Sequence, residues 1–224
     1  MALHDKSTVL ATIRRDGVVP VFHSDNPHLA RAVATSVVDG GLSTIEFTNR
    51  GDGAMEVFGT FARWARKHQP TLVLGVGSVI EASTASLAID LGAEFVFGPS
   101  LSAEVSSVCN ARNVPYVPGC GTVSEILAAY RLGSDIVKLF PAGSIGGPAF
   151  LSAIRAPCPW ISAIPTGGVE PTVESMQPWF DAGAAAVGIG SKLLASEALE
   201  EGNWDGLRER VAAAVAAAEE ARSR

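Results

Sequence analysis

The chain has 224 residues, of which 47% are hydrophobic and 18% are charged, and its formal net charge is −6. This composition is typical of a globular protein with a buried core, so it excludes intrinsic disorder, and the acidic balance argues against nucleic acid or an anionic membrane as a partner. No stretch of about 18 residues is both apolar and uncharged, so we expect neither a membrane span nor an export signal.

The cysteines and histidines argue against metal chemistry. Cys109, Cys120 and Cys158 cannot all pair, and their spacing fits no zinc site. We therefore expect thiols that pack as small hydrophobic groups in a cytoplasmic protein. The four histidines have no metal-ligand spacing either. His23, at the end of a predicted strand, is interpreted as a solvated side chain, and the sequence predicts no metal and no cofactor.

In chain order, eight short runs rich in apolar and β-branched residues alternate with stretches of helical periodicity. The runs begin at Val18, Thr44, Thr71, Glu94, Pro115, Ile136, Trp160 and Ala185, at intervals of 26, 27, 23, 21, 21, 24 and 25 residues. A strand, a helix and two turns need about this many residues. Eight such units predict an α/β fold, a (β/α)8 TIM barrel in one domain, for which about 200 residues is the lower limit.

The chain outside and between these runs fits the same architecture. Residues 1–17 are predicted to form an extra N-terminal helix that closes the floor of the barrel, residues 18–194 the barrel core, and residues 195–224 the last outer helix. Thr122 and Glu125 have the spacing of a capping box at a helix start. A doubly wound open sheet is the alternative, but GVGSV after the third run is a poor match to a dinucleotide loop.

Two charged residues interrupt otherwise apolar predicted strands. Lys138 shares a face with Ile136 and Phe140, and Glu46 lies within TIEFT, so strand alternation directs both toward the barrel interior. A buried neutral lysine can attack a ketone and form an iminium, which weakens the adjacent carbon–carbon bond. A partly desolvated carboxylate can carry the protons of such a reaction. Lys138 and Glu46 are the candidate catalytic residues, and a purely structural ion pair is the alternative interpretation.

Further polar residues follow the predicted strands, at the end of a barrel where reactive groups gather. Arg50 could hold a substrate carboxylate with two parallel hydrogen bonds, and Ser78 could add a hydroxyl to the same group. PTGGV and GIGSKLL are Gly-rich turns after the seventh and eighth runs, where (β/α)8 barrels frequently bind phosphate. The predicted phosphate cradle comprises Thr166, Gly167, Gly168, Gly190 and Ser191.

These residues give the chain a resemblance to the 2-keto-3-deoxy-6-phosphogluconate (KDPG) and 4-hydroxy-2-oxoglutarate (KHG) aldolases. The similarity runs through VVPV, IEFTNR, GVGSV, FVFGPSL, PGCGT, VKLFPA, PTGGV and GIGSKL in order. It implies that Lys138 is the Schiff-base lysine and Glu46 the acid/base. It also implies that Arg50 and Ser78 bind the pyruvyl carboxylate, that Pro99 and Phe140 wall the pyruvyl pocket, and that Thr166 touches the substrate. A homotrimer is implied as well.

The expected activity is cleavage of a 2-keto-3-deoxy-6-phospho sugar acid to pyruvate and D-glyceraldehyde 3-phosphate, with 4-hydroxy-2-oxoglutarate as a further substrate. The expected partners are accordingly pyruvate and a phosphorylated keto acid. Ser78 and Asn49 differ from the residues more common in the family, and Asn49 leaves the preferred sugar acid open. A phosphosugar isomerase or epimerase, and a non-catalytic barrel that binds phosphate esters, are the alternative functions. A colourless purified protein would exclude pyridoxal phosphate on Lys138.

Overall fold

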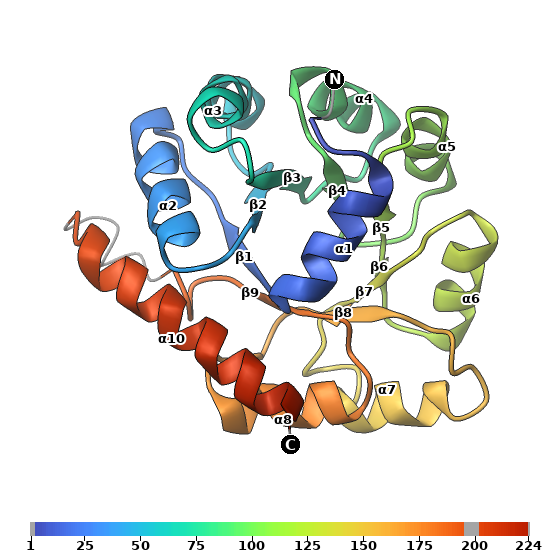
Figure 1. The fold of residues 1–224 in the computed structure, drawn as a ribbon. Coiled ribbons are helices and arrows are strands. Elements are labelled where there is room, and N and C mark those ends of the chain that lie inside the picture. Colours follow the sequence, from blue (N-terminus) through green and yellow to red (C-terminus); the bar gives the residue numbers. More distant parts are fainter. Residues whose placement is uncertain (1–2, 195–201, 224) are drawn as a thin grey trace.

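The computed structural model describes residues 3–194 and 202–223, and in it parallel strands alternate with helices as the sequence predicts. The strands lie at the centre and the helices surround them (Figure 1). The strands are β1 (Val18–Phe22), β2 (Thr44–Thr48), β3 (Val73–Gly77), β4 (Phe95–Phe97), β5 (Tyr116–Val117), β6 (Gly119–Cys120), β7 (Val137–Leu139), β8 (Ala163–Pro165) and β9 (Val187–Ile189). The helices are α1 (Lys6–Asp16), α2 (Pro27–Asp39), α3 (Ala54–His68), α4 (Ala82–Leu91), α5 (Ala103–Ala111), α6 (Val123–Arg131), α7 (Gly147–Arg155), α8 (Val173–Asp181) and α10 (Trp204–Ser223).

The strands form two parallel sheets. One has six strands in the order β5-β4-β3-β2-β1-β9, and the other has three in the order β6-β7-β8. A parallel bridge between Thr166, just after β8, and Gly188 in β9 joins the two sheets on one side. The carboxyl ends of β1, β2, β8 and β9 are thereby brought to the same end of the structure.

The run from Pro115, predicted as one continuous strand, is two short strands, and the prediction was wrong in this detail. β5 pairs with β4, whereas β6 pairs with β7. Pro118 separates the two strands and has no backbone N–H to donate. Gly119 packs directly against the backbone of Pro99, and a Cβ on Gly119 would lie 2.2 Å from the Pro99 carbonyl oxygen.

Strand alternation separates two hydrophobic clusters. Val137 and Leu139 belong to the larger cluster, which includes the buried faces of the outer helices, whereas Ile136 belongs to the smaller one. The smaller cluster lies among the strands and comprises Val9, Leu10, Ile13, Val19, Val73, Phe95, Phe97, Val117, Ile136, Ile164 and Ala186. The period of two predicted for the strand at Lys138 is therefore confirmed.

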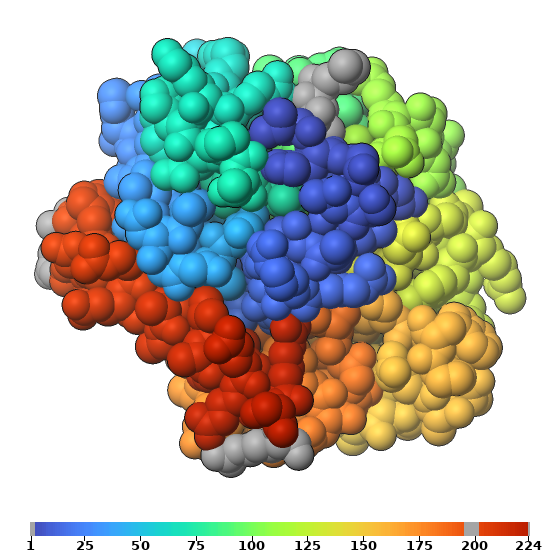
Figure 2. All heavy atoms as spheres, in the orientation of Figure 1, coloured from blue at the N-terminus to red at the C-terminus, as the bar shows by residue number. Residues whose placement is uncertain are grey.

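Helix α1 contributes three residues to the smaller cluster, and it covers the centre of the face shown in Figure 2. It starts at Lys6, with the Asp5 side chain as its N-cap, and ends before Gly17 in the left-handed conformation. The prediction began at Met1, which with Ala2 lies outside the described residues. Asp16 ties the helix end to β2, because its carboxylate accepts bonds from the Ser43 N–H and the Thr44 hydroxyl.

The predicted helix ends are observed where the sequence carries cap signals. The Thr122 side chain caps α6, and a Glu125 carboxylate oxygen accepts bonds from the Thr122 hydroxyl and the Gly121 N–H. The last outer helix is α10, which packs against α2 and α8, while residues 195–201 and 224 of the predicted C-terminal helix lie outside the described residues. Within residues 3–194 and 202–223, no helix is long and apolar enough to cross a membrane.

Candidate active site

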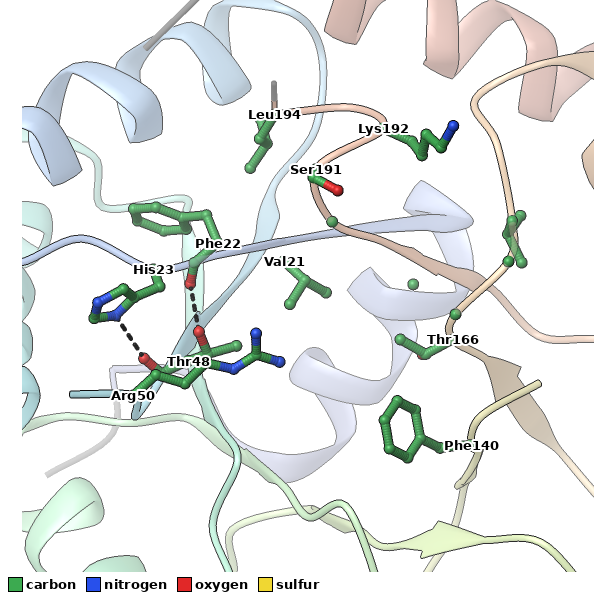
Figure 3. A pocket seen from close by; sticks show the side chains of 15 residues that line it. Val21, Phe22, His23, Thr48, Arg50, Phe140, Thr166, Ser191, Lys192 and Leu194 are labelled. Carbon is green, nitrogen blue, oxygen red and sulfur yellow. Dashed lines mark hydrogen bonds between the residues drawn. The ribbon is translucent and has the colours of Figure 1, made fainter. Parts of the chain in front are cut away.

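A cavity of about 490 Å³ lies at the carboxyl ends of β1, β2, β8 and β9 (Figure 3). Its lining residues are Val21, Phe22, His23, Thr48, Arg50, Phe140, Thr166, Gly167, Gly168, Val169, Gly188, Gly190, Ser191, Lys192 and Leu194. Seven of the residues predicted from the sequence are in this set. The structure therefore gathers Arg50, Phe140 and the whole predicted phosphate cradle around one space.

Lys138 and Glu46 lie together in the interior, next to Phe140 of the cavity wall. The Lys138 Nζ is 3.8 Å from Glu46 Oε2, too long for a hydrogen bond. Lys138 keeps 6% of its surface exposed and Glu46 only 1%. The Lys138 Nζ also faces the rings of Phe97 and Phe140, at 5.5 and 5.2 Å from their centroids. The amine is thus enclosed by aromatic rings without being locked to the carboxylate.

The Glu46 carboxylate is buried without a hydrogen bond. Neither of its oxygens has a hydrogen-bond partner among the described residues. Burial raises the pKa of Glu46, and the positive charges of Lys138 and Arg50 only partly offset that effect. An unsatisfied buried carboxylate is costly, and such groups are found more often at functional sites than elsewhere, so Glu46 is a candidate functional residue.

Gly77 makes the room in which this carboxylate lies. β2 and β3 pair in parallel, with Glu46 opposite Gly75 and Thr48 opposite Gly77. A Cβ on Gly77 would be 1.6 Å from Glu46 Oε1, so any larger residue would displace the carboxylate. Sequence reasoning did not single out Gly77, because only the neighbouring strand shows why the position must lack a side chain.

The other two residues predicted for the pyruvyl end, Ser78 and Pro99, are not among the residues that line the cavity. Ser78 follows β3, is half-buried, and has a φ of 62°, a left-handed conformation that is uncommon for a residue other than glycine. Pro99 follows β4 and is half-buried. The Tyr116 hydroxyl holds the segment after Pro99, since it donates to the Ser100 carbonyl and accepts from the Ser102 N–H.

The two Gly-rich turns approach each other across the cavity. Gly167 and Gly168 follow β8 with φ values of 91° and 85°, a conformation that glycine adopts without strain. Gly190 and Ser191 follow β9 on the facing turn. The Thr166 hydroxyl is buried and, among the described residues, has no hydrogen-bond partner. These turns can present polar groups to an anionic ligand.

Several lining residues were not predicted. Val21, Phe22, Val169, Gly188 and Leu194 carry no chemical signal that the sequence could have revealed. Thr48 could have been found, because it shares the inward face of β2 with Glu46; its hydroxyl donates to the Phe22 carbonyl oxygen at 3.1 Å. His23 is exposed, as expected, and also lines the cavity.

The cysteines pack in or against the hydrophobic core. Cys109 and Cys120 are free and buried, and burial raises the pKa of each thiol to about 12. Both thiols are therefore protonated at neutral pH. In residues 3–194 and 202–223, no group of three or more His, Cys, Asp or Glu side chains is arranged to hold a metal ion.

Comparisons with known proteins identify the family to which this chain is similar. A family model described as KDPG and KHG aldolase matches residues 9–210. A 2-dehydro-3-deoxy-phosphogluconate aldolase of Pseudomonas aeruginosa is 35% identical over 169 residues, which are 75% of each chain. One from Pseudoalteromonas atlantica is 29% identical over 201 residues, covering 90% of this chain and 91% of that one.

A solved structure of KDPG aldolase from Legionella pneumophila, with pyruvate captured as a covalent carbinolamine intermediate, has a TM-score of 0.81 and 26% identity to this chain. The similarity covers 92% of this chain and 97% of that one.

Proposed function

Because the chain belongs to the KDPG and KHG aldolase family, we propose that it is a class I aldolase. It cleaves 2-keto-3-deoxy-6-phosphogluconate to pyruvate and D-glyceraldehyde 3-phosphate, and 4-hydroxy-2-oxoglutarate to pyruvate and glyoxylate. One observation carries the proposal. The buried Lys138 amine lies 3.8 Å from a Glu46 carboxylate that makes no hydrogen bond within the described chain, beside a cavity that can hold the substrate.

The first half of the reaction forms the Schiff base. The Lys138 amine, in its unprotonated form, attacks the C2 ketone and gives a carbinolamine. Loss of water then leaves an iminium. Glu46 lies close enough to the amine to relay the protons of these steps, taking one from nitrogen and giving one to the departing hydroxyl. The aromatic rings of Phe97 and Phe140 exclude bulk water from the reacting nitrogen.

The second half breaks the carbon–carbon bond. The Glu46 carboxylate takes the proton of the C4 hydroxyl, the C3–C4 bond breaks, and its electron pair enters the iminium to give an enamine. The aldehyde leaves, and protonated Glu46 returns its proton to C3. Water then releases pyruvate from Lys138. The raised pKa of Glu46 suits a group that must accept and return a proton in each cycle.

Binding roles follow from the two ends of the cavity. Arg50 holds the pyruvyl carboxylate, with Ser78 as a second donor, and Pro99 and Phe140 wall the pyruvyl pocket; of these four, Arg50 and Phe140 line the cavity described above. Thr166 contacts the middle of the substrate. Gly167, Gly168, Gly190 and Ser191 hold the phosphate, supported by their position on two facing turns that line the cavity.

We also propose a fold, a compartment and an oligomeric state for the whole molecule. The strands form a closed (β/α)8 barrel in a single domain, a view supported by the bridge between Thr166 and Gly188 and by the succession of β5 and β6 across Pro118. α1 is the floor of that barrel, since its apolar residues join the inner cluster. The protein acts in the cytoplasm, as its cysteine usage indicates. It forms a homotrimer, as the family resemblance implies, and sedimentation at micromolar concentration tests the trimer.

Trapping with borohydride tests the mechanism. Pyruvate and borohydride should add one reduced pyruvyl group to Lys138, detected by peptide mass spectrometry, and a coupled assay should detect pyruvate released from the phosphorylated keto acid. A Lys138→Met variant should do neither. Turnover of a phosphosugar without pyruvate release would favour an isomerase, and tight binding of a phosphate ester without turnover a non-catalytic barrel.

A further inference from the structure

An ion pair joins the two Gly-rich turns at the rim of the cavity. The Lys192 Nζ is 3.0 Å from Glu170 Oε1, so the turn after β9 is linked to the turn after β8. Figure 3 shows Lys192 next to Ser191, extending toward the segment that follows Thr166. Lys192 lines the cavity, whereas Glu170 does not. Lys192 therefore belongs both to the lining of the cavity and to an ion pair with the neighbouring turn, and a turn of its flexible side chain would direct the ammonium to a bound anion instead of Glu170.

The pair is exposed, which makes an exchange of partners easy. The side chains of Lys192 and Glu170 are 65% and 52% exposed. Ion pairs between exposed side chains contribute little to stability because water screens them. Replacing Glu170 by a ligand of higher charge would therefore cost the protein almost nothing. A phosphate monoester carries nearly two negative charges and three acceptor oxygens, more than one carboxylate offers.

The distribution of charge in the cavity matches a ligand with two anionic ends. Arg50 and Lys192 are the two side chains of fixed positive charge among the described lining residues. They come from different strands, Arg50 after β2 and Lys192 after β9, which lie on either side of β1. Arg50 is committed to the carboxylate in the proposed function. The Gly-rich turns supply dipoles but no net charge, so Lys192 is the cation available to the second anionic end.

We propose that Lys192 exchanges Glu170 for the phosphate of the substrate, and that this exchange sets the preference for a phosphorylated over an unphosphorylated keto acid. Lys192 is a specificity-determining residue, and Glu170 is a competitor that holds the ammonium at the rim of the empty cavity. This inference rests on the proposed aldolase function. A purely structural role is the alternative, in which the pair only fastens the two turns together.

The two interpretations differ in the sign of one result. If the pair is only a fastener, Lys192→Met and Glu170→Gln break the same contact and should impair the enzyme in the same direction. If Lys192 binds phosphate, the two changes act in opposite directions. Lys192→Met removes the cation, whereas Glu170→Gln frees the cation and removes a negative charge that repels the phosphate.

The experiment compares 2-keto-3-deoxy-6-phosphogluconate with 2-keto-3-deoxygluconate, which differs only by the phosphate. Lys192→Met should raise KM for the phosphorylated acid about tenfold, equivalent to about 1.4 kcal/mol, and leave the unphosphorylated acid unchanged. Glu170→Gln should lower KM for the phosphorylated acid about two- to threefold. Lys67→Met, on an exposed lysine of α3, is the control for loss of one positive charge. Inorganic phosphate should inhibit wild type more strongly than Lys192→Met.

Two results would overturn the inference. One is an increase of KM for the phosphorylated acid in both variants, which would indicate a fastener. The other is a Lys192→Met variant whose kcat/KM falls equally on both acids or on neither. Raising the ionic strength supplies a further check, because screening should raise KM for the phosphorylated acid in wild type and have less effect in Lys192→Met.

A separate measurement keeps this inference distinct from the proposed aldolase chemistry. The enamine on Lys138 exchanges the methyl protons of pyruvate with solvent, and this exchange in D2O, followed by NMR, needs no phosphate. Lys192→Met should retain the wild-type exchange rate. If wild type itself exchanges no protons, the aldolase proposal fails. If exchange persists but Lys192→Met changes the kinetics of the two keto acids equally, only the proposed role of Lys192 fails.

Discussion

Gly77→Ala tests whether the position of the Glu46 carboxylate matters for catalysis. Gly77 does not have a left-handed φ, so its backbone conformation is compatible with alanine. The obstacle is steric, because the new Cβ would lie 1.6 Å from Oε1 and 2.4 Å from Cδ of Glu46. The carboxylate is buried at 1% exposure, so it has to retreat within the interior by about 2 Å to reach normal van der Waals separation.

That displacement sets the expected loss of activity. Misplacing a reacting group by about 1 Å can cost about 10²-fold, and a general acid/base contributes about 10²- to 10⁴-fold. Gly77→Ala should therefore lower kcat by about 10²- to 10⁴-fold, close to the effect of Glu46→Gln. Combining the two changes should add little to either alone, because both act on the same proton transfer.

The assay is pyruvate release from the phosphorylated keto acid, with circular dichroism and thermal unfolding to show that the variant folds. Gly121→Ala is the matched control, since a Cβ there meets Ile145 at an ordinary 3.6 Å and the position has no part in the proposed chemistry. It should keep wild-type kcat. A folded Gly77→Ala protein within about threefold of wild-type kcat would refute the reasoning, as it would show that catalysis tolerates displacement of Glu46.

Three further predictions concern other parts of the structure. Because burial raises the pKa of Glu46 and the ionised form must accept the proton, kcat should fall with decreasing pH at values above the ordinary glutamate pKa of 4.5. A fall in kcat that begins only at or below that pH would contradict this. The residual activity of Glu46→Gln should not show this fall. Arg50→Met should raise KM for the keto acid about 10- to 100-fold by removing a charge-assisted hydrogen bond, whereas Arg63→Met on the exposed face of α3 should have no effect. Asp16→Ala should lower the free energy of unfolding by about 1–3 kcal/mol in urea titrations, while kcat stays unchanged. The change removes the acceptor of the Ser43 N–H and leaves the buried Thr44 hydroxyl with only its longer bond to the Val18 carbonyl oxygen.

The order of elements could be predicted because each depends on local chemistry. The strand runs are β-branched and apolar, and α2 and α6 begin at side chains that cap a helix, Asn26 and Thr122. The break between β5 and β6 could not be predicted with the same ease. Proline allows a strand edge, and the decisive constraint is the approach of Gly119 to Pro99, a contact between residues from different units.

The inward position of Lys138 and Glu46 could also be predicted, since a charged residue in an apolar strand is conspicuous and strand alternation assigns its face. The sequence does not give the distance between Glu46 and Lys138, which are 92 positions apart. That distance decides between a structural ion pair and a reactive pair. The partnership of Lys192 with Glu170 was missed for the same reason. Each looks like an ordinary exposed residue until the two turns are placed together.

The separation of Lys138 from Glu46 is itself informative about mechanism. At 3.8 Å the carboxylate is near enough to relay protons to the amine but makes no hydrogen bond that would fix the ammonium form. Lys138 and Glu46 thus do not form the close ion pair that would stabilise the fold. Gly77 has no side chain, and this leaves the space in which the Glu46 carboxylate lies. A structural ion pair would be expected to close that gap and satisfy the remaining oxygens, because breaking or weakening a buried pair is costly. The open arrangement therefore favours a reactive amine with its proton carrier over a structural ion pair.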